Sequence, residues 1–109
     1  MKNRVLIVDD EPSVRFAIRD FLETNGYEVE EAETCQGAQD AFRGSRPDAA
    51  ILDYMLADGN AVDLLPRLKA IDAGVSLVVL TGHGSIDLAV RAVKAVSYTH
   101  LTLPTILRV

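Results

Sequence analysis

Short apolar segments alternate along the chain with longer segments in which apolar residues recur every three or four positions. The apolar runs at residues 5–8, 48–53 and 75–80 lack polar alternation, which is typical of strands buried on both faces. Residues 27–32 alternate, which predicts a strand with one wetter face. Strand and helix patterns therefore follow one another in turn, which predicts an α/β fold with a parallel sheet.

Proline, glycine and acidic residues mark the expected helix limits. Pro12 suits a first helical position, with Asp10 or Glu11 as its cap, and Asn25-Gly26 closes this helix. A second helix is predicted from about residue 34 to 43, with Gly44 as its end. The turn signal Asp58-Gly59-Asn60 precedes a third helix that ends at Ala73-Gly74, and Ser85 caps a fourth. Pro66 lies inside the third pattern and predicts a late start or a kink.

The apolar positions of each helical pattern define the face expected to pack on the sheet. In the first helix these positions are Val14, Ala17, Ile18, Phe21 and Leu22. In the third helix they are Val62, Leu64, Leu65, Leu68 and Ile71.

Composition restricts the class of protein. The chain has 109 residues, 49% of them apolar and 25% charged, which predicts one soluble globular domain. Its net charge of −5 argues against a direct nucleic-acid partner, because phosphate binding requires clustered Lys and Arg. The one cysteine, Cys35, excludes an internal disulfide and fits the reducing cytoplasm. No apolar run is long enough to cross a bilayer or to form a signal peptide, so we expect a cytoplasmic protein without a membrane partner.

The three unbroken apolar strands all end on polar residues: Asp9-Asp10, Asp53 and Thr81. Each residue alone is most simply a turn former or a helix cap. The carboxyl ends of parallel strands, however, meet at one edge of the sheet, where open α/β sheets bind ligands. At ~4 Å and an effective dielectric of ~20, each carboxylate pair costs on the order of 4 kcal/mol. The joint pattern therefore predicts raised pKa values or a bound cation, and an all-oxygen ligand set favours Mg²⁺.

These motifs resemble the receiver domain of bacterial two-component response regulators. The resemblance covers residues 1–95 and rests on residues 5–10 followed by Glu11-Pro12, on Ile51-Leu52-Asp53, on Asp58-Gly59 and on Leu80-Thr81-Gly82. Residues 81–87 are similar to receivers of the nitrogen-regulator type, which often precede an ATPase that activates an alternative sigma factor. The family implies a flavodoxin-like, doubly wound parallel sheet with five strands in the order 2-1-3-4-5 and helices on both faces.

The resemblance also implies a role for each strand-end residue. Asp53 is the expected phosphoacceptor, which attacks the phosphohistidine of a sensor histidine kinase. Asp10, Asp53 and the main-chain carbonyl of Met55 are expected to hold Mg²⁺, with Asp9 acting through water. Thr81 is expected to move toward the phosphoryl oxygens and report the modification. The family thus predicts a regulatory phosphoprotein rather than an enzyme, which controls an output domain or a downstream protein outside this chain, in transcription regulation.

The chain departs from the family pattern after about Ala95. The position of the phosphate-binding lysine falls on Leu103, and that of the aromatic switch residue falls on His100. Residues 96–105 resemble the translation of a transposon-end sequencing adapter joined in frame, so we expect a receiver domain over residues 1–95 and a non-native tail over residues 96–109. In the alternative reading the tail is divergent and residues 99–103 form a makeshift fifth strand. In both readings the final helix of the family is missing.

Three other functions remain open at this stage. A Mg²⁺-dependent phosphohydrolase would also form an aspartyl-phosphate, but its second acid normally follows the nucleophile by two residues, where this chain has Met55. A flavodoxin-like cofactor site would place phosphate against Asp9-Asp10-Glu11, which would repel it. The third alternative is an inactive, truncated receiver. Without a lysine at position 103, the phosphoryl group loses a cationic contact, so we expect weak signalling by this chain.

Overall fold

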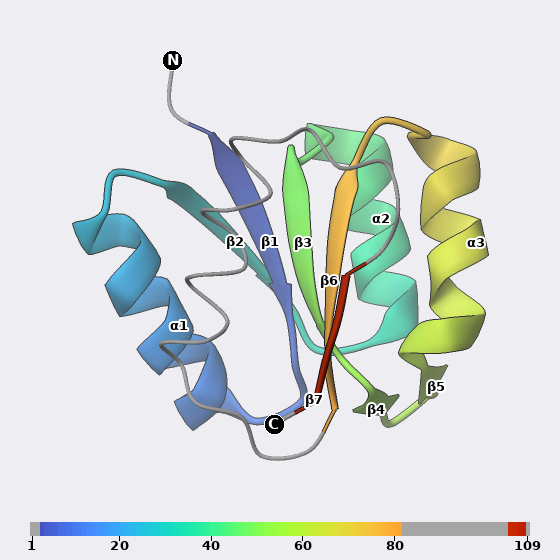
Figure 1. The fold of residues 1–109 in the computed structure, drawn as a ribbon, viewed down its shortest axis with the longest axis horizontal. Coiled ribbons are helices and arrows are strands. Elements are labelled where there is room, and N and C mark those ends of the chain that lie inside the picture. Colours follow the sequence, from blue (N-terminus) through green and yellow to red (C-terminus); the bar gives the residue numbers. More distant parts are fainter. Residues whose placement is uncertain (1–2, 82–104, 109) are drawn as a thin grey trace.

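A five-stranded parallel sheet forms the centre of the molecule (Figure 1). The computed structural model describes residues 3–81 and 105–108. The strands of the sheet are β1 (Arg4–Val8), β2 (Glu28–Ala32), β3 (Ala49–Asp53), β6 (Ser76–Thr81) and β7 (Thr105–Arg108). They lie side by side in the order β2-β1-β3-β6-β7, and all four neighbouring pairs are parallel. Numbered along the chain, this is the predicted order 2-1-3-4-5, which is therefore confirmed.

Three helices cover the sheet in the described part of the chain. Helix α1 (Pro12–Thr24) lies on one face, and α2 (Cys35–Ser45) and α3 (Ala61–Ile71) lie together on the other (Figure 1). A short antiparallel pair, β4 (Met55–Leu56) and β5 (Gly59–Asn60), connects β3 to α3. None of the helices within residues 3–81 is both long enough and apolar enough to cross a bilayer.

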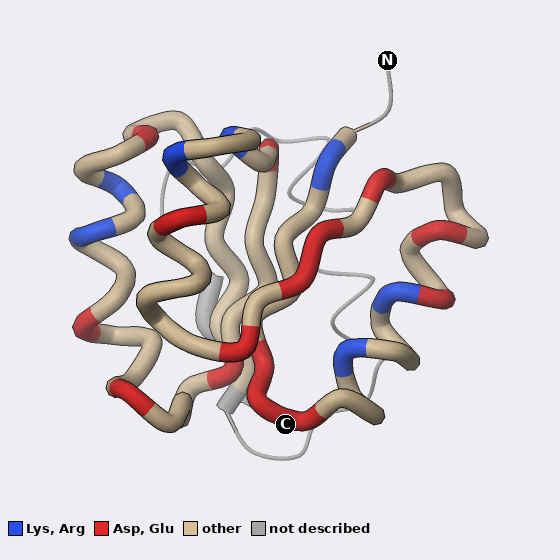
Figure 2. Tube along the Cα trace, turned by 180° about the vertical axis from the view of Figure 1, so that it is seen from behind, with Lys and Arg blue, Asp and Glu red and all other residues tan. Residues whose placement is uncertain are grey.

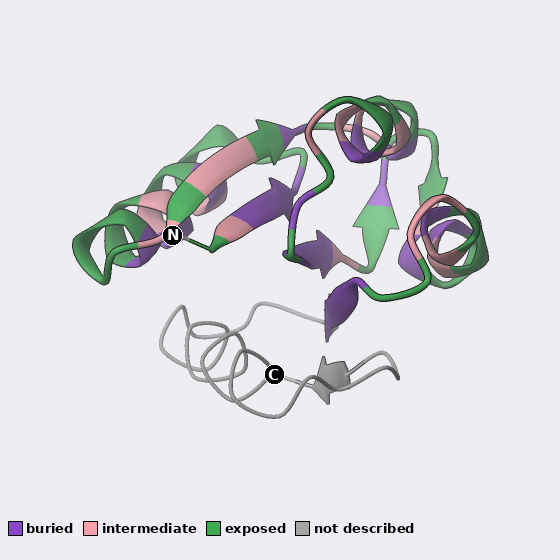
Figure 3. Ribbon diagram, turned by 90° about the horizontal axis from the view of Figure 1, so that it is seen from above, coloured by how far each residue is buried: buried purple, intermediate pink, exposed green. Residues whose placement is uncertain are grey.

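Two apolar clusters hold these layers together, one on each face of the sheet. Successive side chains of a strand point to opposite faces, so Leu6 and Val8 of β1 belong to one cluster and Val5 and Ile7 to the other. The larger cluster joins the sheet to α2 and α3, and the smaller joins it to α1. Figure 3 shows the buried residues concentrated in the strands and on the inward sides of the helices. Phe42 of α2, the largest fully buried side chain among the described residues, belongs to the larger cluster.

The predicted end of α2 is wrong, and so is one of the two alternatives predicted for Pro66, a late start of α3. The other alternative, a kink at Pro66, stays a prediction. Helix α2 does not end at Gly44 but continues through Ser45, and Arg46 ends it in a left-handed conformation with φ of 49°. Helix α3 begins at Ala61 and includes Pro66 in its interior, so the proline does not delay its start. The side chain of Asn60 caps α3 by accepting a hydrogen bond from the amide of Asp63 at 2.9 Å, which fixes the start before the proline is reached.

The predicted apolar faces are correct at their centres and wrong at their edges. Ile18 and Leu22 of α1 are buried, whereas Phe21 is 37% exposed and Arg15 is buried in the row where an apolar residue would be expected. In α3, Val62 is half exposed. Glu11 occupies the N-cap position of α1, but its side chain makes no capping hydrogen bond.

The fifth strand lies later in the chain than expected. The prediction for residues 99–103 falls outside the described residues, and the strand that pairs with β6 is Thr105–Arg108, with Val78 opposite Thr105. The predicted fourth helix also falls outside the described residues. The division into residues 1–95 and a tail of residues 96–109, and the missing final helix, stay predictions.

The packing of the core predicts that replacing two different phenylalanines by alanine changes the free energy of unfolding by very different amounts. Phe42→Ala should lower the free energy of unfolding by about 3–5 kcal/mol, because the side chain is fully buried and leaves a cavity. Phe16→Ala on α1 is the matched control and should change it by less than about 0.5 kcal/mol, since Phe16 is 71% exposed. Urea unfolding followed by circular dichroism measures both. Similar losses in the two variants would contradict the packing described here.

Candidate functional site

Three carboxylates meet at the carboxyl edge of the sheet. Asp9 and Asp10 follow β1, and Asp53 is the last residue of β3. Because β1 and β3 pair in parallel, with Val8 opposite Leu52, the two strands end side by side. One carboxylate oxygen from each aspartate lies within 4.8 Å of the other two. Figure 2 shows acidic residues gathered at this end of the sheet. The convergence expected from the strand ends is therefore present.

Asp9 is held in the cluster by three hydrogen bonds. Its side chain is buried, and its amide donates a hydrogen bond to the carbonyl oxygen of Ala32 at 3.1 Å. Its Oδ1 accepts a hydrogen bond from the amide of Glu11 at 2.9 Å, and its carbonyl oxygen accepts one from Nη1 of Arg15 at 2.7 Å. The backbone and carboxylate of Asp9 are thus held from three directions.

The pKa values of two aspartates reflect this crowding. Burial raises the pKa of Asp9 to about 6; the hydrogen bond from the Glu11 amide opposes the shift, and the charges of Asp53 and Asp10 add to it. Burial also raises the pKa of Asp53, together with the charge of Asp10, while the main-chain amides of Tyr54 and Met55 lower it. A cation among these oxygens would remove the repulsion. The donor set of three carboxylates without His or Cys fits Mg²⁺ better than zinc or copper.

The backbone that follows Asp53 is fixed by the neighbouring strand and by the β4–β5 pair. The amide of Tyr54 donates to the carbonyl oxygen of Leu80 at 3.0 Å, and the carbonyl oxygen of Tyr54 accepts from the amide of Ala61 at 2.8 Å. Met55 pairs with Asn60 across the β4–β5 ladder. The main chain of Met55 is therefore held beside the cluster, while its side chain is 62% exposed.

Asp58 ties this segment to helix α2. Its carboxylate accepts hydrogen bonds from the amides of Cys35 at 2.8 Å and Gln36 at 3.1 Å, in the first turn of α2. These hydrogen bonds lower the pKa of Asp58, and burial raises that of the Cys35 thiol to about 11. Thr34 supplies a second cap to the same helix through Oγ1, which accepts from the amide of Gly37 at 3.0 Å. Asp58 is thus a helix cap supplied by a different part of the chain.

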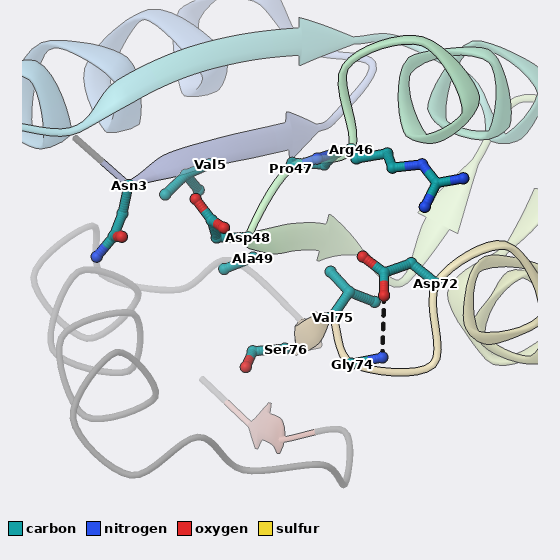
Figure 4. Close-up of a pocket in the computed structure, with 10 residues that line it drawn as sticks. All are labelled: Asn3, Val5, Arg46, Pro47, Asp48, Ala49, Asp72, Gly74, Val75 and Ser76. Atoms are coloured by element: carbon teal, nitrogen blue, oxygen red, sulfur yellow. Dashed lines mark hydrogen bonds between the residues drawn. The ribbon is translucent and has the colours of Figure 1, made fainter. Parts of the chain in front are cut away.

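A pocket of about 250 Å³ lies at the opposite edge of the sheet (Figure 4). It is lined by the amino ends of β1, β3 and β6 and the segments before them. Its two acidic side chains already have partners: Asp48 accepts from the amide of Arg4 at 2.8 Å, and Asp72 from that of Gly74 at 3.0 Å. We therefore assign the candidate site to the carboxylate cluster, not to this pocket.

Comparison with known proteins identifies this arrangement. The family model described as the response regulator receiver domain matches residues 5–105 of the chain. The chain belongs to the receiver domain family. It is thus a signalling module of the two-component response regulators, and its matched relatives include the alginate biosynthesis transcriptional regulatory protein AlgB of Pseudomonas putida.

Three of the matched proteins show how much of each relative the receiver domain represents. Sporulation initiation phosphotransferase F of Bacillus subtilis is 27% identical, over 95% of this chain and 84% of its own length. The nitrogen assimilation regulatory protein NtrX of Azorhizobium caulinodans is 33% identical over 95% of this chain but only 23% of its own length. A CheY-like receiver domain structure from Methanospirillum hungatei superposes with a TM-score of 0.75 at 25% identity, covering 97% of this chain and 82% of that chain.

The structure brings some of the predicted site residues together and leaves others undescribed. Asp9, Asp10 and Asp53 lie together, and Met55 follows two residues after Asp53 at the start of β4. Thr81 is the last residue of β6, one position beyond Leu80, which lies opposite Asp53. The side chain of Thr81, and the whole of residues 100 and 103, lie outside the described part of the receiver.

Two residues beside the site were not predicted from the sequence of this receiver. Arg15 shares the helical row of Ile18 and Leu22, and a charged residue in an apolar row is a signal that could have identified it. Asp58 was interpreted as a turn former, and nothing in its local sequence points to the amides of Cys35 and Gln36, which precede it by more than twenty positions.

The raised pKa of Asp9 predicts an unusual pH dependence in the metal-free receiver. The pKa rises from 3.8 to about 6 on folding, so ionised Asp9 opposes folding above pH 6 and the penalty disappears as the pH falls toward 3.8. Asp9→Asn should therefore raise the melting temperature at pH 7.5, and raise it less at about pH 5. Thermal unfolding in the presence of a chelator measures both values. Asp20→Asn, at an exposed position of α1, is the control. An equal rise in melting temperature for Asp9→Asn at both pH values would contradict the raised pKa of Asp9.

The contact between Asp58 and α2 predicts a stability effect from an exposed residue. Asp58→Ala should lower the free energy of unfolding by about 1 kcal/mol, because two amides at the start of α2 lose their acceptor. Asp20→Ala is the matched exposed control and should change it by less than about 0.5 kcal/mol. Urea unfolding gives both values, and equal stability of the two variants would show that the capping contact contributes nothing.

Proposed function

We propose that this receiver accepts a phosphoryl group on Asp53 from a sensor histidine kinase in a Mg²⁺-dependent reaction. The observation that carries the proposal is the meeting of Asp9, Asp10 and Asp53 within 4.8 Å, with Asp53 partly buried at the end of β3. Asp10, Asp53 and the main-chain carbonyl of Met55 would hold the Mg²⁺, and Asp9 would act through water. When bound, Mg²⁺ offsets negative charge on the carboxylates and on the transferred group.

The chain's own groups define the chemistry of transfer. A carboxylate oxygen of Asp53 attacks the phosphorus, the phosphorus–nitrogen bond of the donor phosphohistidine breaks, and the electron pair stays on the imidazole nitrogen. The fixed backbone around Tyr54 holds this oxygen at the sheet edge, because the amide of Tyr54 is bound to the carbonyl oxygen of Leu80. The product is a phosphoaspartate, and no turnover of a further substrate is required. We therefore propose a regulatory module rather than an enzyme.

The modified state would be reported through Thr81. This residue ends β6 next to the strand that carries Asp53. A phosphoryl group presents strong acceptor oxygens, so a hydroxyl at this place gains a hydrogen bond only after phosphorylation. Leu103, at the position of the family's lysine, offers no positive charge. We infer that the response of this chain to phosphorylation is weaker than in receivers that retain the lysine.

The output of the signal lies in a protein segment or partner outside residues 1–109. NtrX is 33% identical to this chain, but the chain covers only 23% of its length. We propose that this receiver likewise controls an output domain or a downstream protein, in transcription regulation, in the cytoplasm. The reading of residues 96–109 as a non-native tail belongs to this proposal, and the uninterrupted gene beyond codon 95 would test it.

The proposal predicts loss of labelling when the acceptor is removed. Asp53→Ala should abolish incorporation of phosphate from acetyl phosphate in the presence of Mg²⁺, because the attacking carboxylate is gone. Mass spectrometry of the intact protein measures the added phosphoryl group. Asp20→Ala is the matched control and should be labelled like the wild type. Labelling of Asp53→Ala on another aspartate would refute the assignment of Asp53.

A further inference from the structure

Arg15 is a buried charged residue with one hydrogen bond to a member of the acidic site and two to glutamates at the end of β2. It is 8% exposed, on the side of α1 that faces the sheet. Removing a charged side chain from water is costly unless it is paired and hydrogen-bonded. Arg15 has these partners: Nη1 donates to the carbonyl oxygen of Asp9 at 2.7 Å, Nε to Glu31 at 3.1 Å and Nη2 to Glu33 at 3.4 Å.

These contacts make Arg15 a bridge between three parts of the fold. The side chain starts from α1, reaches Glu31 of β2 and Glu33 just beyond that strand, and holds the carbonyl of the first residue after β1. The planar guanidinium suits this arrangement, because each of its three nitrogens donates in a fixed direction. A residue with a single donor group could not make the same three contacts.

The bridge acts against the repulsion within the cluster. One carboxylate oxygen each of Asp9, Asp10 and Asp53 lies within 4.8 Å of the other two, and like charges at this distance repel one another. That repulsion favours movement of the loop with Asp9 and Asp10 away from β3. The hydrogen bond from Arg15 holds the backbone of this loop at Asp9, next to the residue expected to bind Mg²⁺ directly.

We propose that Arg15 is a positioning residue for the metal site: by holding the carbonyl of Asp9 against β2, it keeps the carboxylates of Asp9 and Asp10 in place to receive Mg²⁺. The inference rests on the proposed function, because it assumes that Mg²⁺ binds at this cluster. It assigns to Arg15 no contact with the metal or with the phosphoryl group.

Arg19 provides a matched control on the same helix. It is more exposed than Arg15, and within residues 3–81 its ion pairs join it to Glu31 and Glu23 rather than to the loop after β1. Arg19→Met therefore removes the same charge and one contact to the same glutamate, while the hydrogen bond from Arg15 to Asp9 remains. Any difference between Arg15→Met and Arg19→Met then reports the contact with Asp9.

The test measures Mg²⁺ affinity by isothermal titration calorimetry and the amide resonances of Asp10 and Glu11 by NMR, in protein shown to be folded by circular dichroism. Arg15→Met should bind Mg²⁺ roughly tenfold more weakly, the effect of losing a group that orients a metal ligand. Arg19→Met should bind like the wild type. Arg15→Lys should restore part of the affinity, because an ammonium can reach one acceptor but not three. The two amide resonances should shift in metal-free Arg15→Met and not in Arg19→Met.

The outcomes separate this inference from the function on which it rests. Wild-type Mg²⁺ affinity in folded Arg15→Met overturns the positioning role alone. Equal weakening in Arg15→Met and Arg19→Met also overturns it, because the effect would then come from charge or from Glu31. If Arg15→Met does not fold, Arg15→Lys decides by the same two readouts. Failure of the wild type to bind Mg²⁺ overturns the proposed function together with the inference.

Discussion

Repulsion among three carboxylates is the constraint on which the rest of this structure depends. Asp9, Asp10 and Asp53 lie within 4.8 Å of one another, although like charges at this distance oppose the compact state. The sheet imposes their proximity, because β1 and β3 are neighbours, run in parallel and end together. This receiver domain therefore carries a locally unfavourable arrangement, which a cation among the three carboxylates would offset.

Stability elsewhere in the fold offsets this local cost. The strands that carry the aspartates are buried on both faces by two separate apolar clusters, so their ends cannot move independently of the core. The loops between the core and the site are held by hydrogen bonds: that of Asp9 through Arg15, and that of Met55 through the β4–β5 pair and Asp58. The buried sheet and the separately hydrogen-bonded loops at its carboxyl edge together explain how a small domain can hold three mutually repelling carboxylates in a defined geometry.

The relatives show the family of this domain but do not identify the output domain or protein that it controls. The match to this chain covers 84% of the length of the Bacillus subtilis phosphotransferase but 23% of that of NtrX, so similar modules occur in proteins of different organisation. At the positions where the resemblance predicts a phosphate-binding lysine and an aromatic switch residue, this chain has Leu103 and His100, whereas Asp9, Asp10 and Asp53 are all present. The departures from the expected pattern therefore lie outside the carboxylate cluster.

The sequence by itself determined the order of the elements, the parallel sheet and the meeting of Asp9, Asp10 and Asp53, because all of these follow from local periodicity and from the shared direction of parallel strands. Only the tertiary structure decided which residues hold the acids in place. Arg15 is buried because Glu31, Glu33 and the carbonyl of Asp9 surround it, and Asp58 caps a helix more than twenty positions earlier in the chain. Such contacts join distant segments, so no local pattern of apolar and polar residues contains them.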